Sequence, residues 1–175
     1  MNAGDVRALD ELPEDEARAA LRACCGSARW VEAMLHERPF RDPERLFEAA
    51  SRIWNGLDAA DWDEAFSHHP RIGEPGRIAA AAAPTAGWAA GEQAGATRAN
   101  DEIRAAIAQG NRAYEARFGR IYLVCATGKS GEELLSILQS RLDNAPEAEL
   151  RIAAGEQEKI TRIRLEKLLS SPRKS

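Results

Sequence analysis

The side chain best suited to chemistry in this sequence is His69, which stands in the run His-His-Pro-Arg-Ile-Gly at residues 68–73. A residue before proline is pushed out of the helical region, so we expect His69 where a helix gives way to a glycine-rich loop. Its pKa near neutrality lets a histidine take and return a proton within one turnover. Taken alone, however, this motif fits a helix-end histidine that only hydrogen-bonds a carbonyl better than it fits a catalytic base.

A second candidate is Glu92, which is followed by Gln93 in the first turns of the helix expected after that loop. A helix N-terminus favours an ionised carboxylate there, and the loop can fold His69 against it. The alternative is a solvated surface glutamate, which is the usual state of glutamates in such places.

The third candidate is Arg164, which lies four residues from both Ile160 and Leu168. These apolar flanks indicate that Arg164 faces inward, and a buried arginine requires an anionic partner or ligand. Lys167 falls on a nearby arc of the same helix and is an alternative inward group.

Metal and thiol chemistry are less well supported. His68 and His69 project in different directions and have no third ligand at zinc-type spacing, so we predict no metal site. The three cysteines at 24, 25 and 125 form an odd set with two neighbours. This pattern predicts buried structural thiols in a reducing compartment rather than a disulfide scaffold.

The elements that must position these residues are predicted to be helical. The chain has 175 residues, of which 44% are hydrophobic and 6% aromatic, with many alanines. These values favour an all-α, compact single-domain bundle of about eight helices covering residues 1–175, with residues 1–11 and 170–175 flexible. Residues 118–128 are expected to form one extended buried connector, because a lone strand has no partner. Helices are predicted at 13–25, from 27, at 42–56, 59–68, 88–110 and 111–118, with a break or bend at Gly110, and then from 130 and at 144–169.

Charge and hydropathy exclude several classes of partner. The net charge is -4, and the acidic and basic residues are interspersed, so no basic stripe is available for nucleic acid. The acidic start is unlike a signal peptide, and no apolar stretch approaches the roughly 20 residues of a membrane span. We therefore expect a cytoplasmic protein that binds neither nucleic acid nor membrane.

The order of these features resembles the 2-oxo-4-hydroxy-4-carboxy-5-ureidoimidazoline (OHCU) decarboxylases. The resemblance is strongest at 69–73 and covers about Leu12 to Leu169, through the runs at 24–31, 92–95, 111–119, 122–128, 132–135, 141–144 and 160–165. It implies a carboxy-lyase of urate and purine catabolism that converts OHCU, a small ureide, to (S)-allantoin without a cofactor. The family is often dimeric, which leaves a homodimer open.

The resemblance also assigns residues to the site. It matches His69 to the family's catalytic histidine, Glu92 to the acid of its Ser-x-x-Glu-Gln motif, and Arg164 to the arginine of the closing helix. It implies further substrate contacts, including backbone contacts from the connector, at Pro70, Gln93, Ala89, Leu123, Val124, Cys125 and Ala126. Ala89 replaces the motif's serine and has no hydroxyl to offer.

Two alternatives stay open at this point. Ala89 is consistent with a degenerate family member that has lost or altered its activity on a related ureide. The four tryptophans at 30, 54, 62 and 88 are consistent with a helical binding module that performs no chemistry.

Overall fold

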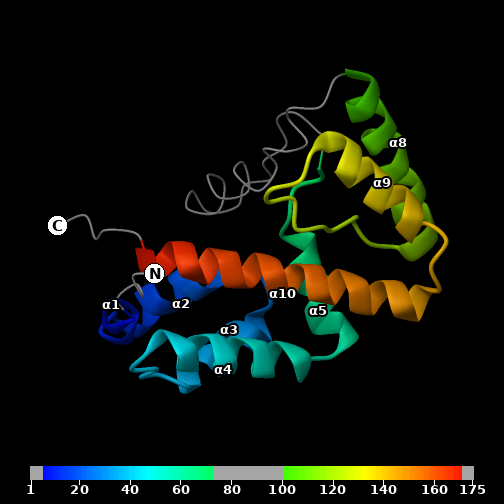
Figure 1. Cartoon of the computed structure of the whole chain (residues 1–175). Helices are drawn as coiled ribbons and strands as arrows, with labels where there is room; N and C mark the ends of the chain where they lie inside the picture. The colour runs from blue at the N-terminus through cyan, green and yellow to red at the C-terminus, as the bar shows by residue number, and fades with distance from the viewer. Residues whose placement is uncertain (1–5, 73–100, 171–175) are drawn as a thin grey trace. The chain divides into compact units, whose positions relative to one another are not determined.

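The computed structural model describes residues 6–72 and 101–170, and every regular element in these two ranges is a helix (Figure 1). The all-α prediction is confirmed for these ranges, which contain no strand. The eight helices are α1 (Arg7–Asp10), α2 (Glu14–Cys24), α3 (Ala28–His36), α4 (Pro43–Asn55), α5 (Ala59–Ser67), α8 (Asp101–Phe118), α9 (Gly131–Arg141) and α10 (Pro146–Ser170). The predicted loop beyond Ile72 and most of the predicted helix from 88 lie outside the described residues.

Local capping signals set several helix starts. Ser27 accepts a hydrogen bond from the backbone N–H three residues later, and Asp42 does the same ahead of Pro43 in the first turn of α4. Ser130 and Glu133 form a reciprocal capping box at the start of α9. Each of these starts was predicted from the sequence.

The chain divides into two compact units, here called the first unit (Met1–Ala65 with Glu158–Ser175) and the second unit (Phe66–Gln157). We describe each unit by itself, and α10 contributes residues to both. The single-domain organisation remains a prediction.

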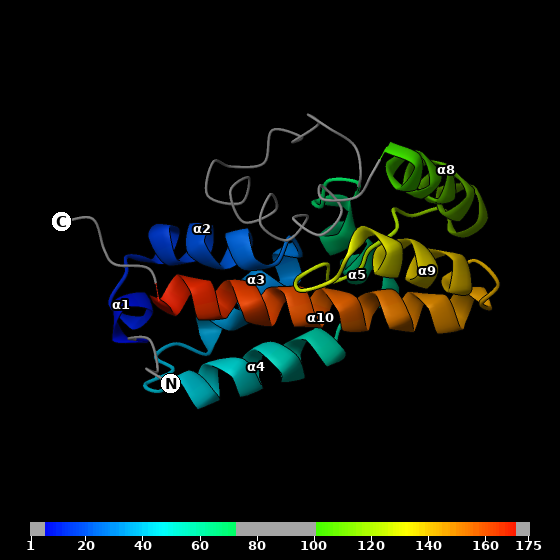
Figure 2. The same ribbon diagram turned by 45° about the horizontal axis from the view of Figure 1, so that its top comes forward.

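In the first unit, α2 packs against α3, and α3 packs against α4 (Figures 1 and 2). Trp30 lies fully buried in this core with Leu21, Met34 and Leu46. The indole N–H of Trp30 donates to the carbonyl of Ala50 at 3.1 Å, so the largest core side chain has its polar atom satisfied.

The start of the chain is more ordered than predicted. Residues 6–11, expected to be flexible, include the short helix α1 with Leu9 buried. The Asp10 carboxylate accepts the backbone N–H groups of Phe40 and Arg41, both at 2.8 Å, and Arg38 donates to the carbonyl of Asp10 at 2.7 Å. These contacts across some thirty residues of sequence hold α1 in place, and no local pattern reveals them.

In the second unit, α8 packs against α9, and the two helices lie side by side in both views (Figures 1 and 2). The predicted break at Gly110 is wrong, because α8 runs through it without interruption. A Cβ atom at Gly110 would lie 2.5 Å from Cδ2 of Leu138 on α9, so the glycine permits close approach of the two helices.

The extended connector between α8 and α9 is confirmed. Residues 121–126 have no regular secondary structure, and Tyr122 to Ala126 are all buried. In the described ranges, no helix combines the length and the apolar character that crossing a bilayer demands.

Candidate active site

His69 lies just beyond the end of α5, at the position that the following proline predicts. Its backbone N–H donates to the carbonyl of Phe66 at 3.0 Å, which closes the last turn of the helix. The side chain is half-buried, and its Nε2 lies 2.7 Å from Oε1 of Gln157 on α10. Gln157 is completely buried. The structure therefore joins the predicted base to a residue that the sequence analysis did not single out.

The segment that follows His69 is held against α8. Arg71 donates through Nε and Nη2 to the two carboxylate oxygens of Glu115, at 2.5 and 2.8 Å. Nδ2 of Asn111 donates to the carbonyl of Ile72 at 2.8 Å. The hydrogen bond from Arg71 lowers the pKa of Glu115, so this carboxylate stays ionised at neutral pH. Pro70 lies half-buried within this clamped segment.

Several backbone groups of the buried connector form hydrogen bonds with side chains of the protein. The carbonyl of Leu123 accepts a hydrogen bond from Arg141 at 2.8 Å, and the N–H of Cys125 donates to Glu156 at 2.7 Å. The carbonyl of Cys125 accepts from Lys129 at 2.8 Å. Val124, which lies between them, is 4% exposed, and its backbone N–H and C=O groups must also be paired.

A buried charge cluster holds this connector. Glu149 is fully buried and accepts hydrogen bonds from Tyr114 at 2.5 Å, from Arg141 at 2.8 and 2.5 Å, and from Asn144 at 2.8 Å. Burial alone would lower the pKa of Arg141, but the hydrogen bonds to Glu149, the charge of Glu149 and the nearby tyrosines together outweigh this effect and raise that pKa. The guanidinium also stacks 4.9 Å from the ring centre of Tyr122. The side chains of this cluster therefore have a structural role.

Arg164 lies on α10 within the first unit and is 4% exposed, whereas Lys167 is half-exposed. The inward group is therefore Arg164 rather than Lys167. Arg164 is close enough to Cys25 to influence its thiol. Burial raises the pKa of Cys25 to about 12, and hydrogen bonds with Ser27 and Thr161 and the charge of Arg164 only partly offset this effect. Cys25 is therefore a protonated, structural thiol, as expected.

One helix carries both Gln157 and Arg164. The two residues are seven positions apart, which places them on the same face of α10 about two turns apart. Both belong to a buried stripe that also includes Ala153, Ile160 and Thr161. A glutamine inside such a stripe is the signal that would have found Gln157 from the sequence. Three predicted site residues, Ala89, Glu92 and Gln93, lie outside the described residues.

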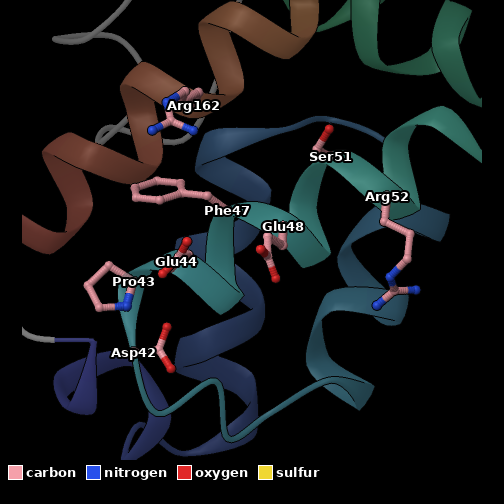
Figure 3. Close-up of a pocket in the computed structure, with 8 residues that line it drawn as sticks. All are labelled: Asp42, Pro43, Glu44, Phe47, Glu48, Ser51, Arg52 and Arg162. Atoms are coloured by element: carbon pink, nitrogen blue, oxygen red, sulfur yellow. The ribbon is translucent and has the colours of Figure 1, made fainter.

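A separate groove of about 890 Å³ runs along α4 in the first unit (Figure 3). Arg162 from α10 lies 4.4 Å above the ring of Phe47, and the acidic side chains of Asp42, Glu44 and Glu48 also line the groove. None of the predicted site residues lines this groove, so it is not the site that the sequence predicts. Across the described ranges, no group of three or more histidine, cysteine or carboxylate side chains is gathered as a metal ion requires.

Comparison with known proteins defines the class of this helical domain. The profile of the OHCU decarboxylase family matches residues 10–166, which is most of the chain. The chain therefore belongs to the OHCU decarboxylase family.

Two curated relatives agree with this assignment. The chain is 36% identical over 166 residues to the uric acid degradation bifunctional protein TTL of Arabidopsis thaliana, a match that covers 94% of this chain and 49% of the relative. The chain thus spans about half the length of that protein. It is 31% identical over 137 residues to the 2-oxo-4-hydroxy-4-carboxy-5-ureidoimidazoline decarboxylase of Amia calva, covering 77% of each.

Two solved structures share the fold. An OHCU decarboxylase crystallised in the presence of (S)-allantoin matches with a TM-score of 0.75 and 33% identity, covering 87% of this chain and 99% of that one. An (S)-allantoin synthase matches with a TM-score of 0.68 at 19% identity, covering 94% of this chain and 53% of the other. The second likeness concerns the fold alone.

Proposed function

We propose that this protein is a carboxy-lyase that decarboxylates OHCU to (S)-allantoin in urate degradation, without an organic cofactor. The observation that carries the proposal is the match to almost the whole length of a solved OHCU decarboxylase crystallised with (S)-allantoin, the product of the proposed reaction. The family assignment over residues 10–166 supports the same activity.

His69 is the proposed base. It accepts the proton of the substrate hydroxyl as the bond to the carboxylate breaks, carbon dioxide leaves, and the electron pair of that bond passes into the ring. The heterocycle delocalises this charge, which is why no cofactor is invoked. That proton then returns to the ring carbon on one face, which yields the (S) product, and a second proton from water neutralises the ring nitrogen that received the electron pair. The half-buried position of His69 beside Gln157 suits a group that must meet both substrate and protein.

Arg164 is the proposed partner of a substrate carbonyl or carboxylate oxygen. A guanidinium that is 4% exposed suits an anionic ligand, because its planar N–H groups can donate to two oxygens of one carboxylate. We assign Glu92 to a ring or ureido N–H, with Pro70, Ala89 and Gln93 as neighbouring contacts. The backbone of Val124 offers the donor and acceptor that a urea-like group pairs with.

The homodimer is proposed from the family resemblance, and the location and the kind of partner are proposed from the cysteines and the interspersed charges of the sequence. We propose that the protein acts in the cytoplasm, that its partner is the small ureide rather than nucleic acid, and that it forms a homodimer. Analytical ultracentrifugation at assay concentrations tests the dimer, and a single monomeric species would contradict it.

The activity is tested by generating the unstable substrate from urate with the two preceding enzymes and then adding this protein. Ultraviolet absorbance follows the decay of OHCU, and circular dichroism follows the chirality of the allantoin formed. Accelerated decay with (S)-allantoin supports the proposal. Decay at the spontaneous rate with racemic allantoin contradicts it, and stabilisation of the fold by allantoin then separates a degenerate enzyme from a binding module.

A further inference from the structure

We propose that Gln157 is a positioning residue that selects the tautomer of His69. Its side-chain carbonyl oxygen accepts a hydrogen bond from Nε2–H, so the neutral ring carries its lone pair on Nδ1, and Nδ1 is the atom that takes the substrate proton. This inference rests on the proposed function and adds to it the reacting atom of the base and the residue that determines it.

The first observation is the contact itself. Nε2 of His69 and Oε1 of Gln157 are 2.7 Å apart, a short distance for two uncharged groups. Gln157 is completely buried in the middle of α10, one turn from Ala153 and one turn from Ile160, which are also buried. A buried amide in a packed helix cannot turn to solvent without leaving its polar atoms unsatisfied, so the acceptor stays in place.

The second observation is that the backbone around His69 is fixed separately. Its N–H closes the end of α5, the Arg71–Glu115 ion pair holds the segment two residues later, and Asn111 holds the carbonyl of Ile72. The side-chain torsions of His69 are therefore the remaining freedom of the imidazole, and the hydrogen bond with Gln157 restrains them. Reactive groups held this way need no reorganisation during the reaction.

The third argument concerns the type of residue. A carboxylate at position 157 would also accept from Nε2–H, but its charge would favour the protonated ring. A general base must be unprotonated before the reaction. An uncharged amide oxygen orients the ring without that effect, which is a physical reason for glutamine at this position.

The test compares Gln157→Met, which has a similar volume and no amide acceptor, with Gln157→Glu, which keeps the acceptor. We expect Gln157→Met to lower kcat by about 10²-fold with KM within about threefold, because a misplaced base affects the chemical step. Gln157→Glu, assayed at alkaline pH so that the ring is neutral, should recover kcat to within about tenfold of the unmodified protein. Gln139→Met, the same change at an exposed position of α9, should have no effect.

A spectroscopic measurement tests the hydrogen bond without turnover. Nitrogen-15 spectra of histidine-labelled protein distinguish the two tautomers, and the signals of His69 are identified by their loss in His69→Asn. We expect a single Nε2–H tautomer in the unmodified protein and a mixture in Gln157→Met. The exposed His36 and His68 serve as internal references.

The outcomes separate this inference from the proposed function. An active protein in which Gln157→Met keeps its kcat and its single tautomer overturns the role of Gln157. Equal losses in folded Gln157→Met and Gln157→Glu mean that the amide donates rather than accepts, which overturns the tautomer. If the unmodified protein lacks activity, the proposed function fails, and the tautomer spectra alone still decide whether Gln157 selects the protonated nitrogen.

Discussion

Two polar groupings of the second unit, both built on α10, differ in how their side chains are used. Around Glu149, a fully buried carboxylate receives hydrogen bonds from a phenol, a guanidinium and an amide. Around His69, a half-buried imidazole meets one buried amide at 2.7 Å. The first grouping is hydrogen-bonded to the connector through Arg141, whereas the second lies at the end of α5.

The difference separates a structural network from a candidate catalytic pair. Buried charges that are fully satisfied hold one arrangement of the chain, and breaking one of them costs stability. A half-buried histidine can take up and release a proton near neutral pH, which suits it to proton transfer. Changes at the two sites should therefore affect different measurements.

The largest expected effect is on turnover, at His69. His69→Ala should lower kcat by about 10²–10⁴-fold, because the general base is removed. The unfolding free energy should fall by only about 1–3 kcal/mol, since one buried amide loses its partner. The neighbouring His68→Ala is the matched control, because His68 is exposed and its loss should leave the rate unchanged. A near-normal rate in folded His69→Ala would remove His69 from the chemistry.

The next largest effect is on stability, at Glu149. Glu149→Gln leaves the Arg141 charge buried without its anionic partner and should lower the unfolding free energy by about 3–5 kcal/mol in urea titrations. The control is Glu166→Gln, which removes the exposed 3.1 Å pair with Arg162 and should cost less than about 1 kcal/mol. Similar losses of unfolding free energy in the two variants would show that the buried cluster contributes no more to stability than an exposed ion pair.

A packing change sharpens the comparison without altering any charge. Gly110→Ala should destabilise the protein by roughly 1–2 kcal/mol, because the added methyl group meets Leu138 at 2.5 Å and this outweighs the gain in helix propensity. Gly155→Ala, where the added atom has no neighbour within 4 Å, should stabilise it by about 0.5–1 kcal/mol. Thermal unfolding of both variants tests these two expectations. A stabilising Gly110→Ala would show that Leu138 and α9 move to accommodate the added methyl group at little cost.

The smallest effect is expected at Glu115. Its ion pair with Arg71 is half-buried and belongs to neither of the two groupings. The folded-state pKa of Glu115 lies below its unfolded value, so the pair stabilises the protein at pH 7. This contribution declines as the pH falls through the unfolded value of about 4.3 and is lost below the folded one. With side chains 40% and 28% exposed, it should amount to less than about 1 kcal/mol. Urea unfolding of Glu115→Gln should therefore differ from the unmodified protein at pH 7, and the difference should shrink as the pH is lowered. A difference that does not change with pH would contradict the role of ionisation.

The features that depend on neighbouring residues could be predicted from the sequence. Capping by Ser27, Asp42 and Ser130 was predictable because each side chain bonds a backbone group within one helical turn. The helix end at His69 followed from Pro70, and the inward direction of Arg164 followed from its apolar flanks. The OHCU decarboxylase family was also identifiable, because its motifs are local runs of residues.

The contacts that join distant parts of the chain became evident only in the fold. Gly110 reads as a helix break in sequence, and its role became evident only with Leu138 beside it. The partners of Asp10 lie some thirty residues away, and Gln157 lies 88 residues from His69. The partners of Gly110 and Gln157 cannot be identified from neighbouring residues, because they depend on which side chain the fold brings to within a few ångströms.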